Sequence, residues 1–250
     1  MMKKLIYILF ICLFSCNTDS ASDCFQTEGN IIQEEFILDV FTKIRIEDDV
    51  TLILKQATEQ KIIIETAENL LNDVAVFIEN ETLVIQDNNG CNFIRDYGVT
   101  KAIISVPNLT EIRNSSSEKV IGEGVLQFPE LKLVSNSTGN VEDTNKSGDF
   151  ILHLECDNLI VNANGQSVFY INGTTNKARI NFGDEWPRFE GEYFIINDLT
   201  IFQRSATTMK VNPLEKITGE IRGTGNVISV HRPLIVEVEE YFTGSLLFQD

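Results

Sequence analysis

The chain repeats one short pattern of apolar and polar residues near its middle. PNLTEIRNSSSEKV begins at Pro107, and PELKLVSNSTGNV begins 22 residues later at Pro129. Superposing the two copies aligns Leu109 with Leu131, Ile112 with Val134, and Asn114 with Asn136. A unit of this length is too short to bury its own apolar face, so neighbouring units must stack to form a core. The repeat therefore predicts a fold built from stacked coils.

Weaker copies of the same pattern follow toward the C-terminus. LIVNANGQSV places Asn162 at the position of Asn114, and further copies end at Val211 and Val227. The valines that close successive copies are separated by 21, 27, 43 and 16 residues, so the length of the unit varies. The gap of 43 residues contains FGDEWPRFEGEYFIIND, residues 182–198, which we expect to project as a loop.

The remaining sequence has the pattern of β-strands. Between Ile44 and Leu54 apolar and polar residues alternate with the period of a half-buried strand. The segments KIIIET, VAVFIE and TLVIQ also have the composition of strands. One helical turn is predicted, at residues 67–71. Asn and Gly at the corners tolerate the left-handed backbone of a tight bend, and stacked Asn side chains can hydrogen-bond from coil to coil. The sequence thus predicts an all-β fold whose polar clusters are structural corners.

The N-terminus has the form of an export signal. Lys3 and Lys4 precede ten apolar residues, LIYILFICLF, which as a helix would span about 15 Å, half of a bilayer's hydrocarbon core. LFSC at residues 13–16 resembles a bacterial lipobox, which makes Cys16 the predicted site of lipidation; ordinary signal cleavage with an incidental Cys16 is the alternative. We expect a signal peptide over residues 1–15, a flexible tether over 16–30 and a single domain over 31–250.

The charge of the chain excludes some partners. Cleavage before Cys16 removes two of the 20 basic residues, so that 18 remain against 37 acidic residues and the net charge is −19. Nucleic acids and anionic lipid headgroups both require a basic surface, so neither is an expected partner. The membrane contact that we expect is through a lipid anchor on Cys16.

Three cysteines remain once the signal peptide and Cys16 are set aside. Cys156 ends the strand pattern FILHLEC on the same face as its apolar residues, which predicts a buried thiol that acts as a small hydrophobic side chain. Cys24 and Cys91 lie in polar, turn-rich segments, and an exported protein can keep a disulfide. A Cys24–Cys91 bridge and two free thiols are equally well supported by these surroundings.

No complete catalytic motif is present in the sequence. His153 and His231 lack the HExxH spacing or the cysteine pair of a zinc site. SSEK at residues 116–119 has the serine–lysine spacing of penicillin-recognising enzymes, but that chemistry needs a helix and these residues are predicted at a corner. The sequence therefore predicts neither a cofactor, nor a metal, nor an enzyme.

One alternative function involves the predicted loop. Enzymes that act on polysaccharides can use carboxylates and aromatic side chains along one face of a β-helix. The loop carries such residues, so carbohydrate binding or cleavage, by a polysaccharide lyase or glycosidase, is the alternative hypothesis. Its candidate ligand-binding residues are Asp184, Glu185, Trp186 and Tyr193.

Several segments resemble the head GIN domain family, described as auto-transporter adhesins and common among surface lipoproteins of Bacteroidetes. They are FTKIRIEDDVTLILKQ (41–56), ETAENLLNDV (65–74), VPNLTEI (106–112), the N-S-[ST] corners, and ITGEIRGTGNVISVHRPLIVEVEEYFTGSL (217–246). The resemblance covers roughly residues 31–248. Relatives tend to have S-G-S-G at the corners, a pattern that only GTGN and FTGS approach in this chain.

The resemblance implies a single-stranded parallel β-helix, or β-solenoid, with coils of about 20 residues. It implies an outer-membrane lipoprotein, at the cell surface or on the periplasmic face, that acts as an adhesin or binding module without enzymatic activity. A glycan or a protein at the cell surface is the expected partner. Relatives with DCF near the start and CNF before the repeats imply a Cys24–Cys91 disulfide here. No catalytic residues come with the family.

Overall fold

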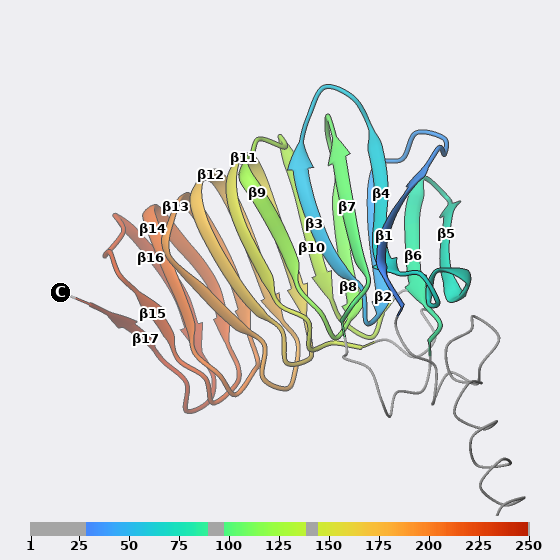
Figure 1. Ribbon diagram of the computed structural model, residues 1–250. Coiled ribbons are helices and arrows are strands. Elements are labelled where there is room, and N and C mark those ends of the chain that lie inside the picture. The colour runs from blue at the N-terminus through green and yellow to red at the C-terminus, as the bar shows by residue number, and fades with distance from the viewer. Residues whose placement is uncertain (1–28, 90–97, 139–144, 250) are drawn as a thin grey trace, which may run out of the picture.

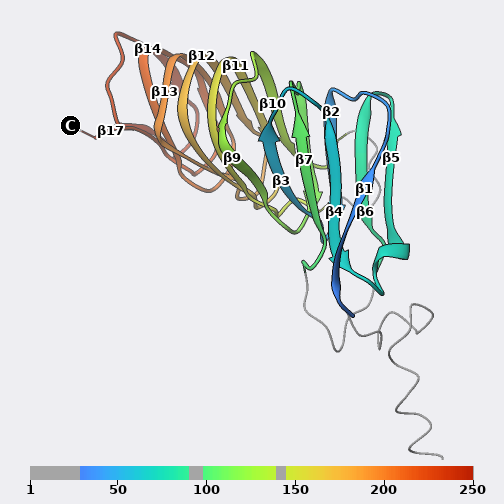
Figure 2. The same ribbon diagram turned by 45° about the horizontal axis from the view of Figure 1, so that its top comes forward.

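The computed structural model describes residues 29–89, 98–138 and 145–249. Strands of one continuous sheet stack along an elongated body that ends at the C-terminus (Figures 1 and 2). The strands are β1 (Ile31–Phe36), β2 (Lys43–Asp48), β3 (Thr51–Gln56), β4 (Lys61–Ala67), β5 (Val74–Glu79), β6 (Thr82–Asp87), β7 (Lys101–Val106), β8 (Glu111–Ser116), β9 (Val120–Leu126), β10 (Glu130–Ser135), β11 (Phe150–Ala163), β12 (Val168–Phe182), β13 (Arg188–Gln203), β14 (Met209–Ile221), β15 (Val227–Ser229), β16 (Ile235–Glu240) and β17 (Leu246–Phe248). A 3₁₀ turn, η2 (Leu71–Asp73), lies beside the predicted helical turn. The all-β prediction is confirmed.

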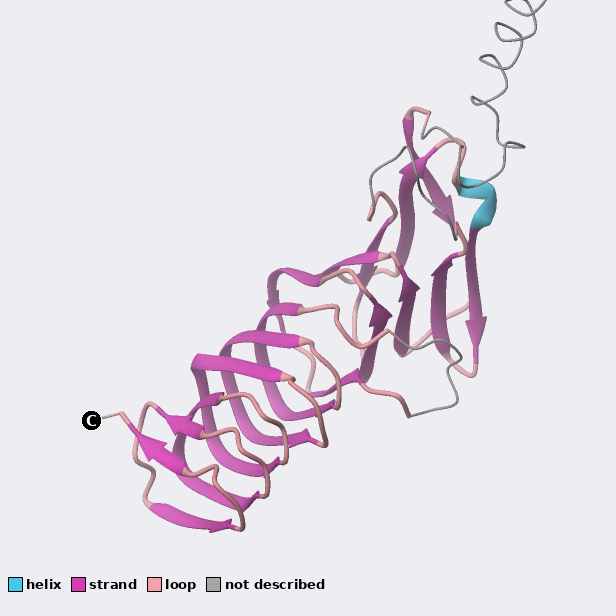
Figure 3. Ribbon diagram, turned by 90° about the horizontal axis from the view of Figure 1, so that it is seen from below, coloured by secondary structure: helices cyan, strands magenta, loops and turns pink. Residues whose placement is uncertain are grey.

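Parallel pairing in register joins successive coils of the C-terminal half. Phe150 of β11 pairs with Phe169 of β12, and Val227 of β15 pairs with Leu246 of β17, in each case 19 residues further along the chain. Figure 3 shows the long strands bending, so that each covers two sides of its coil. One row of inward residues follows this register: Val120, Phe150, Phe169, Phe189, Met209, Val227 and Leu246. Because alternate residues of a strand point to one face, the alternation in the sequence creates this continuous core.

The sheet is mixed, which differs from the purely parallel arrangement expected. β1 and β7 both pair antiparallel with β4, and β5 pairs antiparallel with β6. These pairings lie at the N-terminal end, and among them only β5 and β6 are consecutive strands, joined by the short turn at Asn80–Glu81. Antiparallel neighbours need only a tight turn, whereas parallel neighbours need a longer return path. The β5–β6 pair is therefore a hairpin. In the same region β2 and β3 already pair in parallel, β2 with β6 and β8, and β3 with β7 and β9.

The register of the first two repeats differs by one residue from the superposition of the sequences. Ile112 of β8 pairs with Leu133 of β10, and not with Val134. Further on, Val134 pairs with Asn162, so Asn162 does not occupy the position of Asn114. The corners were located correctly, but the connecting segments differ in length, and a shift of one residue moves a side chain to the opposite face.

The prediction of a projecting loop over residues 182–198 is wrong. Arg188–Gln203 forms strand β13, and only residues 183–187 connect it to β12. Phe189, Phe194 and Ile196 are fully buried in the core. The gap of 43 residues in the repeat pattern therefore contains two coils. The sequence pattern did not show the boundary between them, because the acidic and aromatic residues there resemble those of a loop.

Candidate functional site

Three of the four predicted ligand residues lie at the corner between β12 and β13. Trp186 is 55% exposed, and its backbone N–H donates to the carbonyl of Gly165 in the preceding coil over 2.9 Å. The Glu185 carboxylate forms an ion pair with Lys146 at 2.6 Å, and Asp184 accepts from the Glu185 backbone N–H at 3.0 Å. Both carboxylates thus bond within the protein, in an arrangement typical of a structural corner.

Tyr193 does not join this corner. It lies on β13, five residues beyond Arg188, which at about 3.3 Å per residue places it about 16 Å further along the strand. Its side chain is 76% exposed. The structure therefore separates Tyr193 from the corner that Asp184, Glu185 and Trp186 share.

Replacing Trp186 with alanine is expected to change the free energy of unfolding by about 1 kcal/mol or less, because surface substitutions have small effects. Equilibrium urea unfolding measures this change. Phe189→Ala is the matched control, since Phe189 is an aromatic residue three positions away that is fully buried and should lose several kcal/mol. A loss for Trp186→Ala as large as that of the control would place Trp186 in the core.

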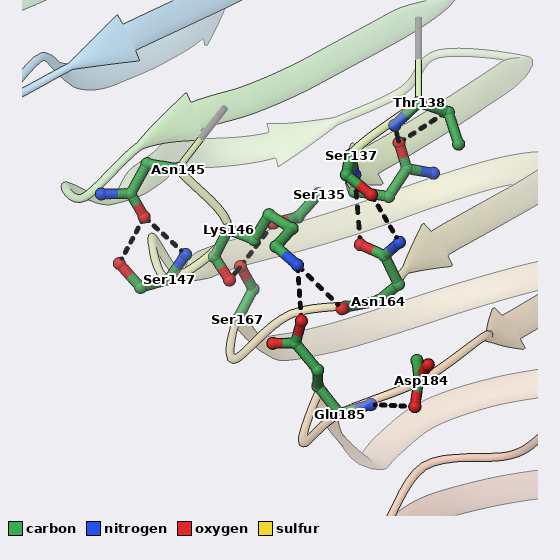
Figure 4. A network of polar contacts seen from close by, with 11 residues as sticks. Ser135, Ser137, Thr138, Asn145, Lys146, Ser147, Asn164, Ser167, Asp184 and Glu185 are labelled. Atoms are coloured by element: carbon green, nitrogen blue, oxygen red, sulfur yellow. Dashed lines mark hydrogen bonds and ion pairs between the residues drawn. The ribbon is translucent and has the colours of Figure 1, made fainter. Parts of the chain in front are cut away.

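A network of polar contacts connects the neighbouring corners (Figure 4). Ser137 and Asn164 of successive coils exchange two hydrogen bonds, from the Ser137 N–H to Asn164 Oδ1 at 3.1 Å and from Asn164 Nδ2 to Ser137 Oγ at 3.0 Å. Ser135 and Ser167 are buried and their hydroxyls lie 2.6 Å apart. Bonding between coils is the structural role that the sequence predicted for the Asn and Ser corners, and it is confirmed here.

The serine–lysine motif also lies at a corner. Ser116 is fully buried at the end of β8, and its hydroxyl accepts the backbone N–H of Glu118 at 3.0 Å. This hydroxyl stabilises a turn, as expected, and the segment is not helical.

A groove of about 490 Å³ crosses the bend of three successive long strands. We call it the bend groove and define it by six residues: Glu155 and Asp157 of β11, Thr174 and Asn176 of β12, and Ile195 and Asn197 of β13. Gln127 and Pro129, from the segment before β10, also line it. The bend groove thus runs along the axis of the coils and brings together residues that are far apart in the sequence.

Hydrogen bonds hold the polar side chains of the bend groove in a row. Asn197 Nδ2 donates to Asn176 Oδ1 at 3.2 Å, and Asn176 Nδ2 donates to Asp157 Oδ1 at 2.9 Å. Gln127 Nε2 donates to Glu155 Oε2 at 2.7 Å. These contacts orient the amides and the carboxylates before any ligand arrives, so binding would not need to order them.

The groove also includes the free thiol of Cys156, which is partly buried beneath the bend. Phe150, Leu152 and Leu154 on the same strand are buried as predicted. Burial raises the pKa of the Cys156 thiol above its ordinary value, although a hydrogen bond to Thr175 at 3.5 Å opposes the shift. The thiol is therefore held in its neutral, less nucleophilic form.

Cys156 is expected to react slowly with iodoacetamide at pH 8 in the folded protein, because only the thiolate is nucleophilic. Mass spectrometry of the peptide that contains Cys156 measures the rate. The control is the same protein in concentrated urea, in which the thiol is exposed and should be labelled rapidly. Equal rates in the two conditions would contradict the burial of this thiol.

The sequence did contain a signal for the bend groove. A polar residue precedes an apolar strand by two positions in CDNLIV, TNKARI and INDLTI, and these segments begin at Cys156, Thr175 and Ile196. Their second letters are the side chains that form the hydrogen-bonded row. The repeat of the bends is less apparent in the sequence than that of the Asn–Ser corners, because only one polar residue per coil marks it.

A second hollow, of about 310 Å³, lies on the neighbouring face of the same strands and has a different lining. Lys177 and Arg179 of β12 line it together with Lys216, which forms an ion pair with Glu237 at 2.8 Å. Asp198 also lines this hollow, so its lining carries three basic side chains and one carboxylate, whereas both charged side chains of the bend groove are carboxylates.

Several predictions concern residues outside the described ranges. They are the signal peptide over 1–15, most of the tether over 16–30, lipidation of Cys16, and the Cys24–Cys91 disulfide. Among the described residues, no group of three or more His, Cys, Asp and Glu side chains is placed to hold a metal ion. No helix in the same ranges is long and apolar enough to span a bilayer.

Comparison with known proteins identifies the family. The sequence pattern of the family described as "Putative auto-transporter adhesin, head GIN domain" matches residues 40–233. The chain belongs to the head GIN domain family. No curated protein matches the chain. The resemblance noted in the sequence is thereby confirmed, including its extent over most of the chain.

Solved structures share the fold of this head GIN domain protein. "A putative adhesin" from Bacteroides fragilis is 19% identical, with a TM-score of 0.77, and the match covers 88% of this chain and 97% of that one. Another putative adhesin, from Parabacteroides merdae, is 16% identical with a TM-score of 0.62, over 90% and 99% of the two chains. A "putative lipid binding protein" from Parabacteroides distasonis is 17% identical with a TM-score of 0.63, over 89% and 98%. At these identities the comparisons establish a common architecture.

Proposed function

We propose that this head GIN domain protein is a lipid-anchored, non-enzymatic binding module of the bacterial cell envelope, with the stacked coils from β8 onward acting as a parallel β-helix. Membership of a family described as adhesins is the observation that carries the proposal. The bend groove supports it, because it offers a polar surface of fixed geometry that opens to the outside of the coils. In this proposal the outer membrane is the site of anchoring, and the partner lies at the cell surface.

The anchor is tested by mass spectrometry of the protein purified from the cells that make it. We expect an N-terminal peptide that begins at Cys16 and carries two or three acyl chains. Cys16→Ala is expected to remove the lipid and release the protein from membrane fractions. An N-terminus without lipid at another residue would contradict lipidation of Cys16.

Adhesion is tested by binding of the purified protein to whole bacterial and host cells, and to an array of surface glycans. Binding to at least one surface is expected, with the urea-unfolded protein as the control. If both whole cells and the glycan array were blank, the binding-module proposal would fail whether or not Cys16 carries a lipid.

A further inference from the structure

We propose that the bend groove binds a linear, neutral polysaccharide along the axis of the coils. The inference rests on the proposed function and deepens it, since it names the ligand class and the residues that contact the ligand. The site is separate from the Trp186 corner, where the carboxylates bond within the protein.

The first argument is the repeat of the groove. Each coil contributes one polar side chain at the same height of the bend, namely Asp157, Asn176 and Asn197. Neighbouring strands are about 4.8 Å apart, so this row extends over about 10 Å in two steps, and the coil that carries Gln127 and Pro129 adds a third step to the groove. The sugar units of a linear polysaccharide also repeat at a regular spacing close to this step. A chain of sugars can therefore present equivalent hydroxyls to successive coils.

The second argument is the chemistry of the lining. Within the described part of the chain, the hydrogen bonds of Glu155 and Asp157 use one oxygen of each carboxylate, Oε2 and Oδ1, which leaves the second oxygen to accept from a ligand. Asn197 provides an amide at the other end of the row. Carboxylates accept strong hydrogen bonds and amides both donate and accept, and this combination matches the hydroxyl groups of sugars.

The third argument is the apolar border of the groove. Ile195 is 40% exposed within the lining, and Pro129 also lines the groove. Tyr193 is 76% exposed and is separated from Ile195 by the buried Phe194, so both exposed side chains lie on the same side of β13. Apolar and aromatic surfaces beside a few fixed polar groups are typical of small-molecule sites, and here they would contact the C–H faces of the sugar rings.

The charge of the groove selects against anionic chains. Glu155 and Asp157 would repel the carboxylates of uronic acids and the sulfates of sulfated glycans, in a protein whose net charge is already −17. An anionic chain would instead be attracted to Lys177 and Arg179 in the second hollow. A neutral polysaccharide is therefore the ligand that the bend groove fits.

The test is isothermal titration calorimetry of the purified protein with cellohexaose, xylohexaose, mannohexaose and an oligomer of galacturonic acid. We expect at least one of the neutral hexasaccharides to bind, and Asn176→Ala to weaken its binding by about tenfold through the loss of one or two hydrogen bonds. Asn181→Ala is the matched control. Asn181 lies on the same strand and also donates to an amide of the preceding coil, Asn162 Oδ1, at 2.7 Å, but it lies outside the groove. The binding constant of the Asn181→Ala variant for the same hexasaccharide should stay within about twofold of that of the unmodified protein.

Each other result would overturn the assignment. If no neutral hexasaccharide binds while the protein still adheres to cells, the bend groove proposal fails and the binding-module proposal stands. If the galacturonate oligomer binds more tightly and Lys177→Ala abolishes its binding, the second hollow is the site. If Asn176→Ala and Asn181→Ala have equal effects on binding, and circular dichroism shows both variants folded, the ligand lies elsewhere.

Discussion

Replacing Phe169 with alanine is expected to lower the free energy of unfolding by about 3–5 kcal/mol, the range for removing a fully buried phenylalanine. Phe169 is fully buried and stacks on Phe150 of the preceding coil, with ring centroids 4.7 Å apart and planes 10° from parallel. It also packs against Phe182 at 6.0 Å. The shortened side chain would leave a cavity between coils that the rigid parallel ladders cannot close. Equilibrium urea unfolding, followed by circular dichroism, measures the loss.

Tyr170→Ala is the matched control for Phe169→Ala. Tyr170 is the next residue on β12, points to the opposite face and is 39% exposed. Its replacement should cost about 1 kcal/mol or less. Similar losses for the two variants would mean that the inward and outward faces of β12 are wrongly assigned.

Replacing Gly219 with alanine is expected to destabilise the protein by about 3 kcal/mol or more. Gly219 has φ +125°, which L-residues rarely adopt, and a Cβ built there would lie 1.9 Å from the carbonyl oxygen of Ile201. Ile201 is its direct partner in the parallel ladder between β13 and β14. Backbone strain and overpacking each cost about 1–3 kcal/mol, and here they add because neither strand can move without breaking the register. Thermal unfolding and urea unfolding both report the change.

Gly124→Ala is the control that separates the cost of backbone strain at a positive φ from the cost of a steric clash of the added Cβ. Gly124 also has a positive φ, +78°, but nothing lies within 4 Å of the position of its Cβ. This variant should therefore lose only the conformational term, about 1 kcal/mol. A loss for Gly219→Ala no larger than that for Gly124→Ala would show that the coils are not packed as closely as the structure has them.

The sequence predicted the strands and corners because both depend on local chemistry. Alternation of apolar residues identifies strands such as FILHLEC, and Asn, Ser and Gly mark the bends between them. The register could not be predicted, because it depends on how many residues each connecting segment uses. Ile112 pairs with Leu133 instead of Val134 for this reason. The same limit hid the coil at β13, whose Trp, Pro and carboxylates resemble a loop although its inward residues are apolar.

The bend groove depends on that register and therefore could not be located from the sequence. Asp157, Asn176 and Asn197 are 19 and 21 residues apart in the chain, and only the pairing of β11 with β12 and of β12 with β13 aligns them. The predicted residues of the Trp186 corner were chosen for their chemical types alone. Chemical type identified exposed side chains, but it could not show which of them converge.

β12 pairs with β11 on one side and with β13 on the other, so a coil of this part contacts only its two immediate neighbours through the sheet. Insertion or loss of one whole coil would leave every remaining ladder intact. Evolution can therefore lengthen or shorten such a molecule by one coil at a time. Each added or lost coil would add or remove one polar side chain of the row in the bend groove. Relatives that differ by one coil would then bind longer or shorter stretches of a polymer, while the contacts made by each single coil stay the same.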